Sequence, residues 1–204
     1  LCHLGKLEAK DFKSTDYFEK LEQTAITMNG ILNKLISIHE INLRELKAEN
    51  INVRDKIFES FELICSKLDC KGAIVLENMI EENTTINADT GLIQELFYVL
   101  IENSIIYRDV QKPDRFLRVT SERNGSANLD IHFMDNGIGV SPDLGERIFE
   151  MFVVGTTTPQ GPGLGLYEAK VISKKLRGDI VLINSKNTLT DFRVTLPTTR
   201  LYFS

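Results

Sequence analysis

This 204-residue sequence has few cysteines and no long apolar run. Cys2, Cys65 and Cys70 are odd in number and lack a zinc-like pairing with histidines. We therefore expect neither a disulfide framework nor a structural zinc site, and a reduced, cytoplasmic compartment fits best. No apolar stretch approaches the roughly 20 residues that span a bilayer, and we expect no signal peptide.

Positive charge is also scarce. The chain has 24 Lys and Arg against 29 Asp and Glu, which gives a net charge of −5. This balance argues against nucleic acid or an anionic membrane as the main partner. A hydrophobic content of 42% is enough for a core and excludes disorder as the dominant state. The length fits one large or two small domains, and because the first residue is Leu rather than Met we expect a fragment of a longer protein.

The first 46 residues are predicted to form a helical hairpin. Its second helix, about Thr15 to Asn42, would be roughly 40 Å long, and its first, about Leu1 to Ala9, about a third of that. The polar stretch Lys10–Thr15 should interrupt the helix, with Ser14 or Thr15 as N-cap. Apolar positions in the second helix recur in steps of four and three, a heptad-like seam made of Leu21, Ala25, Met28, Leu32, Leu35 and His39.

A linker, Lys47–Asn52, is expected to lead into a second domain covering residues 53–204. Helices are predicted at Val53–Asp69, from the Asp89-Thr90 cap through Asn103, and at Leu164–Leu176. Strands are predicted at Ala73–Met79, Thr84–Ala88, Phe116–Arg123, Ala127–Met134, Asp179–Asn184 and Phe192–Leu196. Tight hairpins, such as the one around Asn124-Gly125, argue against a purely parallel sheet. We therefore expect an α+β fold, an α/β sandwich with one mixed sheet and helices on one face.

The stretch from Met134 to Leu166 carries the strongest functional pattern. It opens with Asp135-Asn136-Gly137-Ile138-Gly139 and closes with three glycines at alternate positions, directly before a helical pattern. Glycines in such places let backbone approach a ligand closely, and free N–H groups at a helix start favour phosphate. Between the two ends lie some twenty residues with little regular pattern, which is typical of a lid or a binding loop.

Four motifs of this chain, in this order, resemble the N, G1, F and G2 boxes of sensor histidine kinases. They are helix-borne Asn103, Asp135-x-Gly137-x-Gly139, Ile148-Phe149-Glu150-x-Phe152 and the segment Gly161–Leu166. The resemblance extends over about Thr15 to Pro197. It implies the ATPase superfamily that also includes DNA gyrase, MutL-type repair proteins and heat-shock chaperones, and with it the Bergerat ATP-binding fold.

The resemblance further implies an activity and partners. Residues 1–46 would be part of a dimerisation and histidine-phosphotransfer hairpin, and the intact protein a homodimer. The ATP γ-phosphoryl group would pass to a histidine and then to a response-regulator receiver domain, in two-component signal transduction. The location would be cytoplasmic, including the cytoplasmic part of a membrane-bound sensor. ATP and Mg²⁺ are the implied cofactors.

The same resemblance assigns residues to the pocket. Asp135 would accept the amine of adenine, although a strand-end turn aspartate is the alternative, and Asn103 would hold Mg²⁺, with a structural amide as the alternative. Tyr107 would lie beside the nucleotide or simply pack in the core, and Arg108 would help compensate phosphate charge. The remaining contacts would come from Gly137, Gly139, Gly161, Gly163 and Gly165, and from amides near Leu164, Gly165 and Leu166.

Three positions depart from the family pattern. Val99 replaces an asparagine, Ile106 a lysine and Val154 an arginine, and no Lys or Arg occurs between Arg147 and Lys170. Losing one cationic clamp commonly slows phosphoryl transfer by about 10²-fold. Val99 also occupies the position where hydrolytic members of the superfamily carry a glutamate base, so ATP hydrolysis by water is not expected.

The phosphate-accepting histidine is expected to be missing from this chain. His3 lacks the acidic and basic residues that normally follow the acceptor, and it would lie close to the hairpin turn. His39 is interpreted as a packing residue on the seam, and His132 as a strand-face residue without an acidic companion. Two functional classes stay open. One is the catalytic half of a histidine kinase, and the other is a degenerate module that binds nucleotide weakly or not at all and acts as a scaffold.

Overall fold

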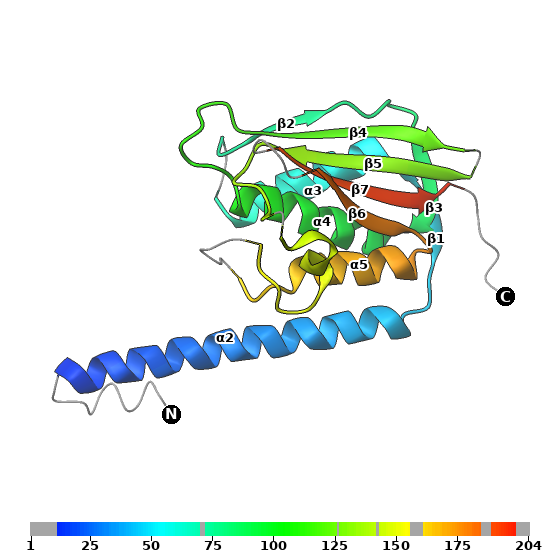
Figure 1. The fold of residues 1–204 in the computed structure, drawn as a ribbon. Helices are drawn as coiled ribbons and strands as arrows, with labels where there is room; N and C mark the ends of the chain where they lie inside the picture. Colours follow the sequence, from blue (N-terminus) through cyan, green and yellow to red (C-terminus); the bar gives the residue numbers. More distant parts are fainter. Residues whose placement is uncertain are drawn as a thin grey trace. The chain divides into compact units, whose positions relative to one another are not determined.

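The structure is a computed structural model that describes residues 12–69, 72–125, 127–141, 143–155, 161–184 and 189–198, with the side chains of residues 12–15 excepted. The chain divides into two units, Leu1–Glu40 and Ile41–Ser204 (Figure 1). The second unit holds the sheet and all of the predicted pocket residues.

Helix α2 (Phe12–Leu43) makes up the described part of the first unit. It begins three residues before Thr15, so the predicted Ser14 or Thr15 cap is wrong and residues 12–15 of the predicted break are helical, because Ser and Thr cost a helix interior only a few tenths of a kcal/mol. Lys10 and Asp11, the first two residues of the predicted break, lie outside the described residues. The predicted first helix and His3 lie outside the described residues, and His39 is exposed rather than packed. Most exposed apolar side chains of α2 fall within one stripe of about 100°, and Ile26 lies outside it. The stripe consists of Tyr17, Leu21, Met28, Leu32, Ile36 and Leu43. None of the described helices is long and apolar enough to cross a membrane.

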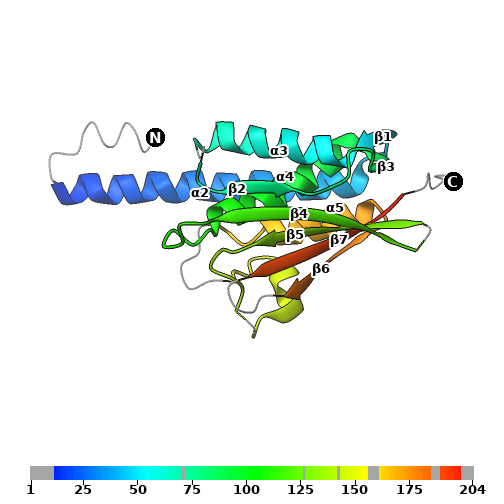
Figure 2. The same cartoon turned by 90° about the horizontal axis from the view of Figure 1, so that it is seen from above.

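The second unit is built on a five-stranded mixed sheet. Its strands are β2 (Val75–Asn78), β4 (Phe116–Asn124), β5 (Asn128–Asp135), β6 (Asp179–Asn184) and β7 (Thr190–Pro197). Their order across the sheet, β2-β4-β5-β7-β6, can be followed in Figure 2. Only β2 and β4 run parallel, and the other described neighbours are antiparallel. The predicted mixed sheet is therefore confirmed.

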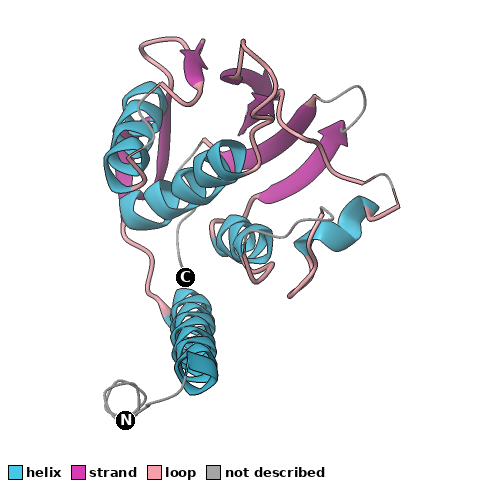
Figure 3. Cartoon of the chain, turned by 90° about the vertical axis from the view of Figure 1, so that its left-hand side faces the viewer, coloured by secondary structure: helices cyan, strands magenta, loops and turns pink. Residues whose placement is uncertain are grey.

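Three helices cover one face of this sheet: α3 (Val53–Lys67), α4 (Thr90–Ile106) and α5 (Gly165–Lys175) (Figure 3). Alternate strand residues are buried under them, as expected for a sheet with one covered face. On β5 these are Leu129, Ile131 and Phe133, and Phe97 of α4 packs on the Phe133 ring with centroids 5.6 Å apart. The predicted helices and strands of this unit all exist, with ends shifted by a few residues.

The stretch predicted to be a linker is instead mostly a strand. Residues of β1 (Ala48–Asn52) pair with β3 (Thr85–Asp89) in a separate two-stranded antiparallel ribbon, with Ile51 opposite Ile86 and both buried. A five-residue strand with a single buried side chain shows too little alternation of apolar and polar residues to be predicted from sequence. Only a partner strand more than thirty residues later makes this segment β, and it belongs to the same unit as the pocket.

Each strand of this β1–β3 ribbon ends on a helix cap. Asn52 ends β1 and accepts a hydrogen bond from Asp55 N at the start of α3. Asp89 ends β3 and accepts one from Leu92 N at the start of α4, which confirms the predicted cap. The buried Asp89 carboxylate also accepts from Lys47 N at 3.1 Å and pairs with Arg44 at 2.9 Å.

Candidate functional site

Strand alternation places Asp135 under helix α4. It is the last residue of β5 and continues the inward-facing series of Leu129, Ile131 and Phe133, so its carboxylate is buried with only 7% of the residue exposed. A charged group in such a place needs hydrogen-bond donors. Gly137 N donates to Oδ1 at 2.8 Å, and Ser104 Oγ of α4 donates to Oδ2 at 3.3 Å.

Burial raises the pKa of Asp135 from its ordinary value of 3.8 to about 6. The Gly137 N–H, the Ser104 hydroxyl and the positive charge of Lys112 oppose this rise in pKa but do not cancel it. The carboxylate is therefore mostly ionised at neutral pH and titrates close to it. A group of this kind can accept a hydrogen bond from an amine donor that enters the pocket.

The turn after Asp135 lies against the end of α4. Ile138 N donates to the main-chain carbonyl of Tyr107, the C-cap residue of α4, at 3.0 Å. A Cβ on Gly137 would clash with that carbonyl, so glycine is required by close approach. Gly139 has φ +79°, a conformation that glycine adopts without strain. Tyr107 thus meets the turn through its backbone, and its ring is half-buried.

A second group of predicted residues meets where α4 faces the start of α5. A Cβ on Gly165, the first residue of α5, would lie 3.6 Å from both Asn103 Oδ1 and Val99 Cγ1. Asn103 Nδ2 is buried and has no hydrogen-bond partner among the described residues. Leu164, the N-cap residue of α5, is buried and makes no capping hydrogen bond with its side chain, so the first-turn amides of α5 have no side-chain acceptor from the N-cap.

The loop between the two glycine segments is tied down at both described ends. A short 3₁₀ helix, η1 (Gly145–Phe149), buries Phe149 edge-on against the Phe192 ring, with centroids 6.2 Å apart. Phe152 is 56% exposed, and its N–H donates to Gly163 O at 3.0 Å. Gly163 has φ +71°, and a Cβ there would meet Val153 O at 2.7 Å. Gly161 is exposed, with no atom within 4 Å of a Cβ, and residues 156–160 lie outside the described part.

Three basic side chains that lie close in sequence to the motifs are engaged in other contacts. Arg108 Nη1 donates to Ile105 O at 2.6 Å, at the C-terminal end of α4, while its Nε is buried without a hydrogen-bond partner in the described part of the chain. Arg147 lies 3.6 Å from Glu150, and Lys170 lies 2.7 Å from Asp179. Ile106 and Val154 are half-buried and bring no charge.

Sequence reasoning missed three residues of this site: Ser104, Lys112 and Asn136. Ser104 follows Asn103 directly and lies one helical turn after Leu100, so its inward direction was readable from the spacing. Lys112 and Asn136 gave no local signal, because their contacts join two segments more than twenty residues apart.

His132 does have an acidic companion, contrary to the prediction. Its Nδ1 lies 3.1 Å from the Asp191 carboxylate of β7, and its Nε2 lies 3.7 Å from Glu122 of β4. The pairing comes from sheet register rather than from sequence proximity, because Asp191 is 59 residues away. It lies on the face of the sheet opposite the buried series of β5, away from Asp135.

The residues at the start of α5 fit a hydrated cation held together with phosphates. Mg²⁺ takes oxygen ligands and keeps several waters, so one amide oxygen from the protein can suffice. Asn103 offers that oxygen, and its Nδ2 makes no hydrogen bond with the described residues that binding of a cation would break. In the described part of the chain, no group of three or more His, Cys, Asp or Glu could hold a metal alone. The remaining ligands would have to be phosphate oxygens and water.

Comparison with protein families gives a match to the family described as "Histidine kinase-, DNA gyrase B-, and HSP90-like ATPase", over residues 88–200. Among curated proteins, the chain is 31% identical over 207 residues to the autoinducer 2 sensor kinase/phosphatase LuxQ of Vibrio harveyi, covering 97% of this chain and 22% of LuxQ. It is 23% identical to the sensor histidine kinase GacS of Pseudomonas protegens, covering 92% of this chain and 22% of GacS. The chain thus spans less than a quarter of the length of these relatives.

Solved structures share the fold. Full-length ShkA in complex with AMPPNP superposes with a TM-score of 0.71 at 19% identity, over 98% of this chain and 42% of that one. The Acinetobacter baumannii histidine kinase AdeS superposes with a TM-score of 0.71 at 18% identity, over 98% of this chain and 92% of that one. Both likenesses support the architecture of helices on one face of a mixed sheet.

Proposed function

The chain belongs to the histidine kinase-, DNA gyrase B- and HSP90-like ATPase family, and from this we propose that it is the ATP-binding catalytic region of a sensor histidine kinase. The observation that carries the proposal is that two groups of residues with different chemistry meet the C-terminal half of α4. In one group, a buried carboxylate, Asp135, lies beside a close-packed glycine. In the other, the amide of Asn103 faces the uncapped start of α5.

Each group would take one part of the nucleotide. The ionised Asp135 would accept a hydrogen bond from the adenine amine, and the absence of a side chain on Gly137 lets the turn after Asp135 pack against the Tyr107 carbonyl. The N–H groups in the first turn of α5, from Gly165 to Tyr167, would donate to phosphate oxygens. Asn103 would bind Mg²⁺ through its amide oxygen, and that ion would supply the positive charge that offsets the phosphates.

The phosphoryl group would go to a histidine on a helical hairpin and then to a response-regulator receiver domain. None of the described histidines fits the acceptor role, because His39 is exposed and makes no ion pair with a carboxylate among the described residues, and His132 is held between two carboxylates on the sheet. We propose that α2 belongs to the dimerisation hairpin. Its exposed apolar stripe, which includes Leu21, Met28 and Leu32, would be buried in a homodimer.

A degenerate binding module is the second candidate, and one observation favours it. Arg147 and Lys170, which bound the stretch without basic residues, pair with Glu150 and Asp179. Ile106 and Val154, at the two positions where the family pattern has a basic residue, carry no charge. Such a site would bind the nucleotide more readily than it would stabilise a phosphoryl-transfer transition state.

Titration calorimetry of the purified chain tests the first proposal. We expect MgATP and MgADP to bind, GTP to bind at least tenfold more weakly, and EDTA to reduce the affinity for ATP. Absence of binding of either adenine nucleotide at millimolar concentration would contradict it. Incubation with radiolabelled ATP and Mg²⁺ should leave the chain unlabelled. Acid-labile label that disappears in His3→Gln would instead identify His3 as the acceptor.

A further inference from the structure

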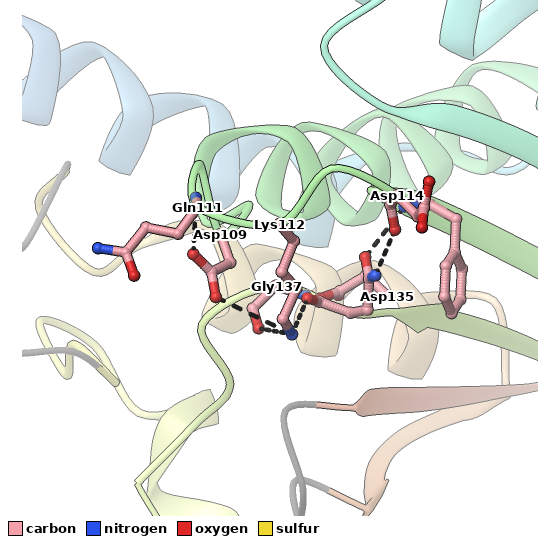
Figure 4. A network of polar contacts seen from close by, with 8 residues as sticks. Asp109, Gln111, Lys112, Asp114, Asp135 and Gly137 are labelled. Atoms are coloured by element: carbon pink, nitrogen blue, oxygen red, sulfur yellow. Dashed lines mark hydrogen bonds and ion pairs between the residues drawn. The ribbon is translucent and has the colours of Figure 1, made fainter.

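The loop between α4 and β4, residues 107–115, crosses the turn that follows Asp135. Figure 4 shows the two segments side by side, with Lys112 reaching from the loop to the turn. Its ammonium group donates to the main-chain carbonyl of Asn136 at 2.6 Å and to that of Gly137 at 3.4 Å. Asp109 of the same loop lies 4.0 Å from Lys112 Nζ, so the ammonium lies between this carboxylate and the turn.

The Asn136 side chain fastens the same two segments from the other side. Its Oδ1 accepts a hydrogen bond from Phe116 N at 3.0 Å, and its Nδ2 donates to Asp114 O at 2.6 Å. Asn136 thereby joins the turn to the end of the loop, and Lys112 joins it to the middle. The residue between Asp135 and Gly137 is therefore fixed through its backbone and its side chain.

We propose that Lys112 is a positioning residue of the nucleotide site, which holds the Asn136–Gly137 turn so that Asp135 and Gly137 face the adenine. The identity of the ligand rests on the proposed function, whereas the positioning is a property of the ligand-free chain. Hydrogen bonds from an ammonium to carbonyl oxygens are charge-assisted and stronger than neutral ones. With only 26% of its side chain exposed, Lys112 makes these bonds partly shielded from water.

Lys112 is not a substitute for the lysine that the family pattern has at the position of Ile106. It binds carbonyls next to Asp135, whereas Ile106 lies in the last turn of α4, which also carries Asn103. The positive charge of Lys112 also acts on Asp135: it lowers the pKa of the Asp135 carboxyl, which burial raises. The other groups that face this carboxylate are the Ser104 hydroxyl from α4 and the Gly137 N–H, while its strand neighbours Leu117 and Thr190 carry no charge.

A comparison of three variants tests the proposal. Lys112→Met keeps the length of the side chain and removes the ammonium, and Lys112→Arg keeps a positive charge and donors. Lys175→Met is the matched control, because Lys175 donates to Asn42 O at 2.8 Å, at the opposite end of α5 from Gly165. Amide hydrogen exchange at Gly137 and Ile138, and the carboxyl-carbon titration of Asp135 followed by NMR, are measured without nucleotide.

In Lys112→Met we expect at least tenfold faster exchange at Gly137 and Ile138 and an Asp135 pKa above that of the parent. Lys112→Arg should restore most of both, and Lys175→Met should change neither. At pH 8, where Asp135 is ionised in every variant, Lys112→Met should still bind MgATP about fivefold or more weakly than the parent. Unchanged exchange and titration in Lys112→Met would overturn the proposal. If the parent chain binds no ATP but Lys112→Met still shows the faster exchange and the higher Asp135 pKa, only the proposed function would be overturned.

Discussion

The two ends of the proposed nucleotide site, the base end at Asp135 and the phosphate end at the start of α5, differ in how completely the protein satisfies its own polar groups. At the base end, Asp135 accepts two hydrogen bonds, and Asn136 and Gly137 are held by Lys112 and by the loop after α4. At the phosphate end, Asn103 Nδ2 has no partner among the described residues, and α5 starts without a side-chain cap. The base end is therefore held in place by hydrogen bonds within the protein, whereas the phosphate end has N–H donors without a partner in the described structure.

This difference is consistent with what each part of the proposed ligand, ATP, requires. Adenine is recognised by a few directed hydrogen bonds, which are effective only when their acceptors are fixed in advance. Phosphates arrive with their own charge, water and Mg²⁺, so open N–H groups and one amide oxygen suffice. Mutations at the two ends should therefore fail differently, with loss of recognition at the base end and loss of metal dependence at the phosphate end.

Asp135→Asn should have the largest effect. It removes the charged acceptor, so the affinity for MgATP should fall by about 100-fold or more. The same change should stabilise the ligand-free fold at pH 7.5, by up to about 3 kcal/mol, because it removes a buried carboxylate whose pKa is raised from 3.8 to about 6. Calorimetry and urea unfolding measure the two effects. A variant that binds as tightly as the parent would show that the base site is misplaced.

Asn103→Ala should reduce the affinity for MgATP by roughly 10- to 100-fold and leave the affinity for ATP in EDTA almost unchanged. The fold should lose little stability, because the amide has an unpartnered buried atom in the described structure. Val99→Ala, a change on the same face of α4, is the control and should keep the metal dependence. Equal losses with and without Mg²⁺ would remove Asn103 from the metal site.

A change of pH should act at the base end alone. Binding requires ionised Asp135, so the affinity for adenosine, which has no titrating phosphate, should fall about tenfold between pH 8 and pH 5. The stability of the ligand-free chain should move the other way. A carboxyl whose folded-state pKa is raised stabilises the fold below pH 4, and this stabilisation is lost as the pH rises through about 6. Asp191→Asn, at a buried aspartate paired with His132, should keep the adenosine profile.

Ile106→Lys should have the smallest effect, a gain of a few-fold in the affinity for MgATP. It adds one cation in the last turn of α4, which also carries Asn103, and restores the charge that the family pattern has there. Adenosine affinity should not change. A gain that is equal for adenosine and ATP would mean that the added lysine acts on the base end, which would remove the distinction between the two ends.

Much of the fold was predictable from local pattern. Alternation on β5 and the Asp89 cap of α4 are properties of a few neighbouring residues, and both were correct. The β1–β3 ribbon was not, because its strand character arises from pairing with residues more than thirty positions away. The start of α2 was misjudged because polar residues were taken as a break.

The candidate site shows the same division. Asn103, Asp135 and the glycines were recognisable because the family motif keeps them in order along the chain. Ser104 and Lys112 were missed, because their roles depend on the distance between α4, its following loop and the turn after β5. His132 was misread for the same reason, since its carboxylate partner comes from the neighbouring strand β7.

The β1–β3 ribbon also determines where the second unit can be cut. A truncated chain that begins at Val53 would lose β1 and leave Thr85–Asp89 as an open edge, with unpaired main-chain groups that favour aggregation. It would also lose the Asn52 cap of α3 and the Arg44 and Lys47 contacts to Asp89 at the start of α4. A domain expressed from Ile41 keeps all of these, so the useful boundary for expression lies inside α2 rather than after the ribbon.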